Sequence, residues 1–468
     1  MKQDFLDYIQ KTFLFTDDDI KKFEEYIEKP LKKSIRINTN KISVKDFKSL
    51  ASKNNWRLTP SFLWKNTFYI DRDDVSTPLW STLEHISGLF YIQEIAASSS
   101  PFYMSLDKVD KSELTILDMS ASPWWKTTSL SEYYPNSIIV ANELLKPRLK
   151  WLFVNLNRMS SLNTIVTNYD WRFFKNLPEA FDKILLDAPC SGEWTAFKSP
   201  ETLKFWNIKN IKKISRLQFW LLESAFTALK TWWEIVYSTC TLNKIENEWV
   251  INKLIKKYWN NLKIIPINKK NSYKRNWQHL DFTWWFFVAK IKKTSSLTTI
   301  LQKEDNITPE FDKKQNKWDK EEDIKFVRQN IEKLSNKEAK SIKTFIKNTF
   351  WYGEKYYLYK YKTSIFLTNK NLDYIWEKLF LYQIWVHIWE LKNSEFMPNF
   401  YLWTIIKFKN NTIDIDNKDL DKLYSWKFLE IDKKDWYYQI INKSIPAGIA
   451  KIKNKRLKSL LENNLIRR

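Results

Sequence analysis

Short apolar runs alternate with helical or loop stretches between Leu114 and about Lys293. The runs read ELTILDM, SIIVANE, NTIVTNYD, DKILLDAP, EIVYSTC and WFFVAKIK. This alternation is typical of a doubly wound, mostly parallel α/β sheet. Because ligands of such sheets bind in the crevice at the carboxyl ends of the strands, the residues that end these runs are candidates for a functional site.

The segments on either side of this region follow other patterns. The N-terminal segment has helical spacing of apolar residues and then the alternating run SIRINTNK at 34–41, which predicts a small α+β lobe. A polar stretch without periodicity after the α/β region is interpreted as a linker, and the aromatic and β-branched runs beyond it predict a basic, mainly β, α+β domain. The expected parts are an N-terminal lobe (1–100), the α/β domain (101–293), a linker (294–325) and a C-terminal domain (326–468).

The excess of cationic side chains predicts a polyanionic partner. The 468 residues include 77 Lys and Arg against 54 Asp and Glu, a net charge of +23 at pH 7. Each phosphate that a cation neutralises releases a counterion, so nucleic acid is the leading partner and an anionic membrane surface the second. The longest apolar stretches, such as WWFFVA at 284–289, fall far short of the ~20 residues that span a bilayer. We therefore expect a cytoplasmic protein that is neither membrane-embedded nor secreted.

Glycine and tryptophan occur in abnormal numbers. The chain has 4 Gly and 25 Trp, whereas Gly alone makes up about 7% of an ordinary chain. Trp232 and Trp233 precede a strand-like run, where a turn favours a positive φ and therefore Gly. Some bacterial lineages read the codon UGA as glycine, and a translation that reads UGA as tryptophan writes Trp at those positions. We hypothesise that many of the printed Trp residues are Gly; the alternative is a genuinely Trp-rich protein.

Two thiols and four carboxylates end the predicted strands. Cys190 and Cys240 are the only cysteines, and without a C-x-x-C pattern or clustered His we expect no metal site. A thiol in such a position acts as a nucleophile when nearby cations or helix N-termini lower its pKa. An acidic side chain about 25 residues after the end of the first strand is where such folds accept hydrogen bonds from ribose hydroxyls. The carboxylates are Asp118, Glu143, Asp170 and Asp187.

Four ordered segments resemble the RNA (cytosine-5)-methyltransferase family of the Sun/Nop type, whose members use S-adenosylmethionine. They are YIQEIAASSSP (91–101), LDMSASPWWKTT (117–128), LLDAPCSGEWT (185–195) and VYSTCTLNKIENEWVI (236–251). The closing segments QIWVHIWELK (383–392) and SIPAGIAKIKNKRLKSLLENNLIRR (444–468) resemble the RNA-binding extension of the bacterial branch that methylates 16S ribosomal RNA.

The same resemblance bears on the tryptophans. The family has glycine where the chain has Trp124, Trp125, Trp194, Trp232, Trp233 and Trp249. By contrast, Trp64 and Trp206 occupy places where the family accepts a true Trp. A separate departure is Ser120, where the family often has Cys; we expect little effect because this loop contacts the cofactor through its backbone.

The resemblance implies a Rossmann-like methyltransferase domain between an N-terminal RNA-binding lobe and a C-terminal RNA-binding domain. Cys240 matches the nucleophile that adds to carbon 6 of cytosine, so that carbon 5 attacks the sulfonium methyl group. Cys190 matches the thiol that releases the enzyme afterwards. Asp187 would donate to, or stabilise, the ring nitrogen at position 3, and Lys126 would assist and lower the pKa of the nucleophilic thiol.

The cofactor site follows from the same motifs. The loop would hold S-adenosylmethionine, Glu143 would bind its ribose hydroxyls, Asp170 would lie by the adenine and Asp187 by the methionine end. Arg36 and Asn38 match a motif near the RNA path, or else lie on a strand surface. The loop residues are Ser120, Ala121, Ser122, Pro123, Trp124, Trp125 and Lys126.

The expected protein is thus a monomeric enzyme whose partner is RNA, 16S ribosomal RNA or the small ribosomal subunit, with no membrane partner. Transfer RNA stays open as the substrate. If Trp124 and Trp125 are genuine, their indoles would fill the cofactor crevice, and the chain would be an RNA-binding or ribosome-assembly protein without catalysis.

Overall fold

A computed structural model describes most of the chain. The described residues are 2–106, 113–122, 125–197, 200–268, 271–297 and 332–460, the last range with gaps at 352–355, 373–378, 380–386, 393–394, 399–401, 404–406 and 409–410. Most of the predicted linker, the residues Pro123 and Trp124, and the tail after 460 therefore lie outside the described residues. Within the described part, no helix is long and apolar enough to cross a membrane.

A sheet of eight strands forms the centre of the molecule. Its order is β10-β12-β9-β8-β5-β6-β7, with β11 paired to β12 off this path. The strands β5 to β9 pair in parallel, whereas β10, β11 and β12 are antiparallel to their neighbours. The predicted α/β class is confirmed, and each of the six apolar runs falls on a strand. The strands are β5 (Thr115–Asp118), β6 (Ile138–Asn142), β7 (Thr164–Thr167), β8 (Phe181–Asp187), β9 (Leu229–Thr239), β10 (Leu262–Ile265), β11 (Tyr273–Asn276) and β12 (Phe286–Lys293).

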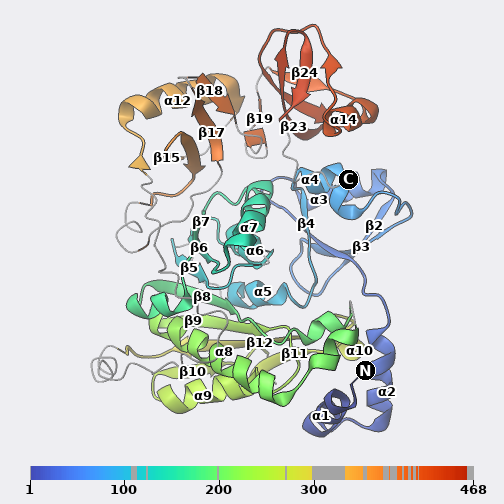
Figure 1. The fold of residues 1–468 in the computed structure, drawn as a ribbon, viewed down its shortest axis with the longest axis vertical. Helices are drawn as coiled ribbons and strands as arrows, with labels where there is room; N and C mark the ends of the chain where they lie inside the picture. Colours follow the sequence, from blue (N-terminus) through green and yellow to red (C-terminus); the bar gives the residue numbers. More distant parts are fainter. Residues whose placement is uncertain are drawn as a thin grey trace.

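Both faces of this sheet are buried. Alternate residues of a strand point to opposite faces: Ile116 belongs to a cluster with residues of α5 and α6, and Leu117 to a cluster with residues of α7, α8 and α9. In the same way, Leu185 of β8 belongs to the first of these clusters and Leu186 to the second. Figure 1 shows α8 and α9 in front of the sheet. The helices are α5 (Ser99–Ser105), α6 (Trp125–Tyr133), α7 (Lys146–Met159), α8 (Ile208–Ala228), α9 (Glu248–Tyr258) and α10 (Gln278–Asp281), with short 3-10 turns η2 (Trp171–Asn176), η3 (Glu193–Phe197) and η4 (Pro200–Phe205).

The strand β5 is the point at which the winding of the sheet reverses. The chain proceeds from β5 through β6 to β7 on one side, and then returns to β8 and β9 on the other. Ligands of such sheets bind at the carboxyl ends of the strands beside this reversal, which are here the ends of β5 and β8.

The N-terminal region divides between two surfaces. Its strands form an antiparallel sheet of order β2-β3-β1-β4, whereas α1 and α2 pack away from that sheet, beside α10 (Figure 1). Phe5 and Phe23 of these helices contact Trp285, and the Phe23 ring stacks on it at 5.1 Å. The elements are α1 (Gln3–Phe13), α2 (Asp17–Ile27), β1 (Ser34–Ile37), α3 (Val44–Lys53), β2 (Trp56–Pro60), β3 (Thr67–Arg72), η1 (Leu79–Ser81), α4 (Leu83–Ile86) and β4 (Phe90–Ile92).

Arg36 and Asn38 do not lie on a surface. Both are at most 1% exposed. Arg36 forms an ion pair with Glu132 of α6, with Nε and Oε2 3.1 Å apart, and Asn38 donates through Nδ2 to the carbonyl oxygen of Met159 at 2.9 Å. The strand-surface alternative is wrong, because both side chains are buried and join the N-terminal sheet to the α/β domain. Their place near the RNA path stays a prediction.

The described C-terminal residues form two five-stranded sheets rather than one. Their orders are β13-β15-β16-β17-β18 and β20-β22-β23-β24-β21, and β14 pairs with β19. Figure 1 shows them as separate orange and red parts. Thr368 donates to the carbonyl oxygen of Leu162, and Ser87 donates to that of Pro446, so each part contacts the rest of the chain. The elements are β13 (Glu332–Lys333), α12 (Asn336–Thr349), β14 (Phe350–Trp351), β15 (Tyr357–Tyr361), β16 (Ser364–Thr368), β17 (His387–Lys392), β18 (Glu395–Pro398), β19 (Lys407–Phe408), β20 (Thr412–Asp414), α14 (Asn417–Tyr424), β21 (Leu429–Glu430), β22 (Tyr437–Asn442), β23 (Ile445–Lys453) and β24 (Arg456–Ser459).

Two tryptophans have a backbone conformation that favours glycine. The φ angles are +73° at Trp232, within β9, and +62° at Trp426, just after α14. Trp426 N–H donates to the carbonyl of Leu423 and Lys427 N–H to that of Lys422. This is the Schellman arrangement that ends helices, and its left-handed residue is usually Gly. The backbone at both positions therefore favours the hypothesis that these residues are Gly.

Candidate active site

The two cysteines meet at the carboxyl ends of neighbouring parallel strands. Asp187 at the end of β8 is in register with Ser238 near the end of β9, so the loops that follow leave the sheet side by side. Cys190 lies three residues after Asp187 and Cys240 two residues after Ser238. Their sulfur atoms are 2.9 Å apart, and both residues are partly exposed. The structure thus brings together two residues that are 50 positions apart in the sequence.

The thiols influence each other electrostatically. The contact with Cys190, followed by burial, raises the pKa of the Cys240 thiol well above its usual range. The Lys126 ammonium acts in the opposite direction, as the sequence predicted, but it does not outweigh these two causes. A thiol with a raised pKa is protonated at neutral pH, so Cys240 must lose a proton before it can act as a nucleophile.

A buried ion pair lies beside the thiols. Lys126 at the start of α6 contacts Asp187, with Nζ and Oδ2 2.5 Å apart, and Ser238 donates through Oγ to Asp187 Oδ1 at 2.7 Å. The side chains of Lys126 and Asp187 are 7% and 19% exposed. The two carboxylate oxygens of Asp187 are therefore held by donors from α6 and β9, and its orientation toward the crevice is fixed.

The loop after β5 contains buried polar atoms without protein partners. Among the described residues, neither Asp118 Oδ1 nor Ser122 Oγ has a hydrogen-bond partner. Thr127 donates to the other oxygen of Asp118 at 2.6 Å, and burial raises the pKa of Asp118 to about 7. Buried polar groups normally have partners. A ligand with polar groups next to Ser120 and Ala121 could supply partners for these two atoms.

The remaining predicted cofactor residues end the next two strands. Glu143 follows β6 and is 4% exposed; it accepts from the backbone N–H of Leu145 at 2.8 Å. Asp170 follows β7, caps η2 and forms an ion pair with Arg172 at 2.8 Å. Both carboxylates lie at the same edge of the sheet as the β5 loop, but Asp170 is already held by a guanidinium group. The positions of Pro123 and Trp124 lie outside the described residues.

Trp125 differs from the two tryptophans expected to be genuine. Its ring lies 5.1 Å from the Lys126 ammonium, and its buried Nε1 has no partner among the described residues. Trp64 donates through Nε1 to Ser105 at 3.2 Å, and Trp206 donates to Glu193 at 2.8 Å. A buried indole N–H normally finds an acceptor. The surroundings therefore suit Trp at 64 and 206 but not at 125.

Sequence reasoning missed several residues of this region. The sequence places Asp118 at the end of a strand but indicates no role for it, and it does not distinguish Ser238, Glu193 or Glu246 from their neighbours. Ser238, Glu193 and Glu246 lie within or close to the two segments that contain the cysteines, and this position is the feature of the sequence that could have identified them. No group of three or more His, Cys, Asp or Glu that could hold a metal ion occurs in the described part of the chain.

Comparison with protein families matches two successive regions. Residues 104–292 match the family described as 16S rRNA methyltransferase RsmB/F, and residues 1–95 match the N-terminal domain of 16S rRNA methyltransferase RsmF.

Curated relatives and a solved structure agree with this match. The chain is 39% identical over 298 residues to the ribosomal RNA small subunit methyltransferase F of Erwinia tasmaniensis, and 42% identical over 294 residues to that of Salmonella arizonae. These alignments cover 61% and 59% of the chain, and 62% and 61% of the two relatives' lengths. A solved methyltransferase homologue from Pyrococcus horikoshii is 28% identical with a TM-score of 0.53, over 63% of this chain and all of the other.

Proposed function

We propose that this chain, whose residues 104–292 belong to the family of 16S rRNA methyltransferases RsmB/F, methylates carbon 5 of a cytidine in 16S ribosomal RNA with S-adenosylmethionine as the methyl donor. The observation that carries the proposal is the pair of thiols beside the Lys126–Asp187 ion pair. The names of the curated relatives refer to the small-subunit RNA and so support ribosomal over transfer RNA. A cytoplasmic monomer is part of the same proposal.

The residues of the crevice fit S-adenosylmethionine. Its adenosyl hydroxyl and amino groups are the kind of polar partner that Asp118 Oδ1 and Ser122 Oγ lack in the described part of the chain. Ser120 to Lys126 would hold it together with Glu143, Asp170 and Asp187. The cofactor supplies an electrophilic methyl group on a sulfonium centre. The backbone of the β5 loop and the carboxylates that end β6 and β7 would hold and orient it.

Addition of a thiolate makes carbon 5 of cytosine nucleophilic. Cys240 Sγ, once deprotonated, forms a bond to carbon 6, and the electron pair of the 5,6 double bond moves toward carbon 5 and the ring nitrogen at position 3. Asp187 donates a proton to that nitrogen, and the Lys126 ammonium, whose Nζ lies 2.5 Å from Asp187 Oδ2, supplies that proton to Asp187. Carbon 5 then accepts the methyl group.

Release of the enzyme requires a base near the adduct. Cys190, as a thiolate, takes the proton from carbon 5, the electron pair restores the 5,6 double bond, and Cys240 leaves carbon 6 as a thiolate. The ring nitrogen at position 3 returns its proton to Asp187. The short distance between the two sulfur atoms places this base next to the bond that must break. The two thiols therefore have successive roles in one reaction.

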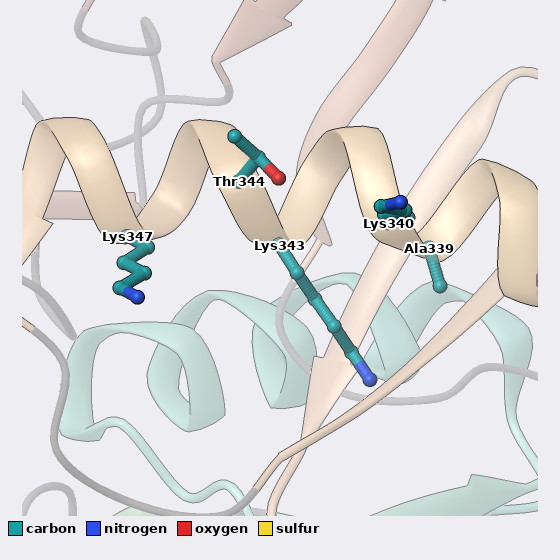
Figure 2. A pocket seen from close by; sticks show the side chains of 5 residues that line it. All are labelled: Ala339, Lys340, Lys343, Thr344 and Lys347. Carbon is teal, nitrogen blue, oxygen red and sulfur yellow. The ribbon is translucent and has the colours of Figure 1, made fainter.

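The basic face of α12 supports RNA as the partner. Lys340, Lys343 and Lys347 are exposed, and with Ala339 and Thr344 they line a hollow of about 350 Å³. Figure 2 shows the Lys343 and Lys347 side chains extending from the same side of the helix. A chain with all three lysines replaced by Gln is expected to bind 16S RNA more weakly and to lose about two units from the slope of log affinity against log salt; an unchanged slope would remove this face from the RNA path.

The proposed activity is tested by methyl transfer from labelled S-adenosylmethionine to 16S ribosomal RNA and to transfer RNA. The enzyme is the full chain with Gly at the six positions 124, 125, 194, 232, 233 and 249, called here the glycine form, and Cys240→Ala is the control. Transfer to 16S RNA that disappears in the control supports the proposal. Transfer only to transfer RNA would change the substrate, and tight RNA binding without any transfer would identify a non-catalytic binder.

A further inference from the structure

Each cysteine loop carries a buried carboxylate that binds the backbone of the other loop. Glu193, three residues after Cys190, accepts from the backbone N–H of Leu242 at 2.6 Å and of Asn243 at 3.3 Å, in the Cys240 loop. In return, Glu246 accepts from the backbone N–H of Ser191 at 2.9 Å and from its hydroxyl. Hydrogen bonds between each carboxylate and the backbone of the opposite loop thus join the two loops.

A shared amide completes the connection. Asn243 donates through Nδ2 to Glu193 at 2.8 Å and to Glu246 at 2.7 Å. Gln218 donates to Glu246 at 2.8 Å from α8. Glu193, Asn243 and Glu246 are each at most 2% exposed. Buried carboxylates are costly unless fully hydrogen-bonded, and here donors surround both of them.

We propose that Glu193 and Glu246 are positioning residues that set the separation of Cys190 and Cys240, and through it the rate at which Cys190 releases the RNA adduct. The inference rests on the proposed function. Cys240 directly follows β9, which is hydrogen-bonded to β8 on one side and β12 on the other. Cys190 lies in a loop beyond the end of β8, so loss of the connection displaces Cys190 more than Cys240.

The variant Glu246→Gln tests this with almost no change in volume. Oε1 of Glu246 accepts from Ser191 Oγ and Asn243 Nδ2, and Oε2 accepts from Ser191 N and Gln218 Nε2. Because both oxygens face N–H donors, the amide group of Gln opposes at least one donor in either orientation. Glu248→Gln is the matched control, because Glu248 pairs with Arg275 instead of the cysteine loops.

The experiment measures two products of a single turnover of the glycine form on labelled 16S RNA: methylated RNA, and the covalent RNA–protein adduct that survives denaturation. Misplacement of a reacting group by about 1 Å costs roughly 10²-fold in rate. We expect Glu246→Gln to form the adduct at a near-normal rate and to release it about 10²-fold more slowly, and Cys190→Ala should show the same excess of adduct. Its affinity for S-adenosylmethionine should stay unchanged, and Glu248→Gln should resemble the parent.

The outcomes separate this inference from the proposed function. If Glu246→Gln loses adduct and product in equal proportion, or behaves as the parent does, the positioning role is overturned. If Glu246→Gln does not fold, Ser191→Ala replaces it as the test, because this variant removes one hydrogen-bond donor and leaves the carboxylate in place. Ser191→Ala must then show the same excess of adduct, or the inference fails. If the parent itself transfers no methyl group and forms no adduct, the proposed function fails instead.

Discussion

Cys190 and Cys240 place their sulfur atoms 2.9 Å apart at the ends of two parallel strands. This contact is the largest cause that raises the pKa of Cys240. The proposed nucleophile is therefore restrained by the residue that we propose releases it after methyl transfer. Displacement of Cys190 from this contact when the substrate enters would favour the Cys240 thiolate.

Removal of Cys190 should make Cys240 more reactive. In Cys190→Ala the pKa of Cys240 falls, and each unit of that fall gives about tenfold more thiolate below the pKa. Alkylation of the single remaining thiol by iodoacetamide at pH 8 should be faster than alkylation of Cys240 in the parent, as followed by peptide mass spectrometry. An equal or slower rate would show that Cys190 does not restrain the nucleophile.

Asp187 should be needed for catalysis more than for the fold. In Asp187→Asn the side chain keeps its shape but no longer pairs as a carboxylate with Lys126. Loss of a group that assists proton transfer typically costs about 10² to 10⁴ in rate. We expect methyl transfer to fall by this factor, and exposed Asp73→Asn to leave it unchanged. Transfer at the parental rate in Asp187→Asn would exclude the proposed role.

The sequence predicted the sheet because its strands are buried on both faces and carry unbroken apolar runs. It also predicted that Asp187, Cys190 and Cys240 lie close together, since the motifs place them at strand ends that parallel pairing brings together; their catalytic roles stay a prediction. It did not predict the burial of Arg36, because SIRINTNK alternates in the way that a half-exposed strand does, and the partner Glu132 lies 96 positions further along the chain. The reciprocal role of Glu193 and Glu246 depends on two loops meeting in space, which no local pattern indicates.

The contribution of Asp118 to stability should decrease as pH rises from about 4 to 7. Burial raises the pKa of Asp118 to about 7, whereas an unfolded Asp loses its proton near pH 4. The folded state therefore binds this proton more tightly, and its stabilising effect is complete below about pH 4 and is lost as pH approaches 7. Chemical unfolding at several pH values should show a smaller decrease in Asp118→Asn than in the parent; identical slopes would mean that Asp118 does not titrate in this range.

The tryptophan hypothesis makes opposite predictions for different positions. Trp426→Gly should stabilise the chain by about 1 to 2 kcal/mol, because a residue with a side chain is strained in the left-handed region. By contrast, Trp206→Gly should destabilise it by at least about 3 kcal/mol, since Trp206 is buried and hydrogen-bonded. The gene should have UGA at 426 and UGG at 206. Codons of UGG at 124, 125, 232 and 426 would reject the hypothesis.

The ion pair of Arg36 and Glu132 should hold the N-terminal sheet on the α/β domain. The two side chains are 0% and 3% exposed, and Arg36 also donates to Thr128 at 2.9 Å. In Arg36→Met the Glu132 carboxylate stays buried without its cation, and breaking such a pair costs about 3 to 5 kcal/mol.

Arg57, which pairs with Asp71 and Asp73 at the surface, is the matched control, and Arg57→Met should cost less than about 1 kcal/mol. Denaturant unfolding compares the two. Equal costs would mean that Arg36 does not join the domains, whereas RNA affinity lost without any loss of stability would support its expected place near the RNA path.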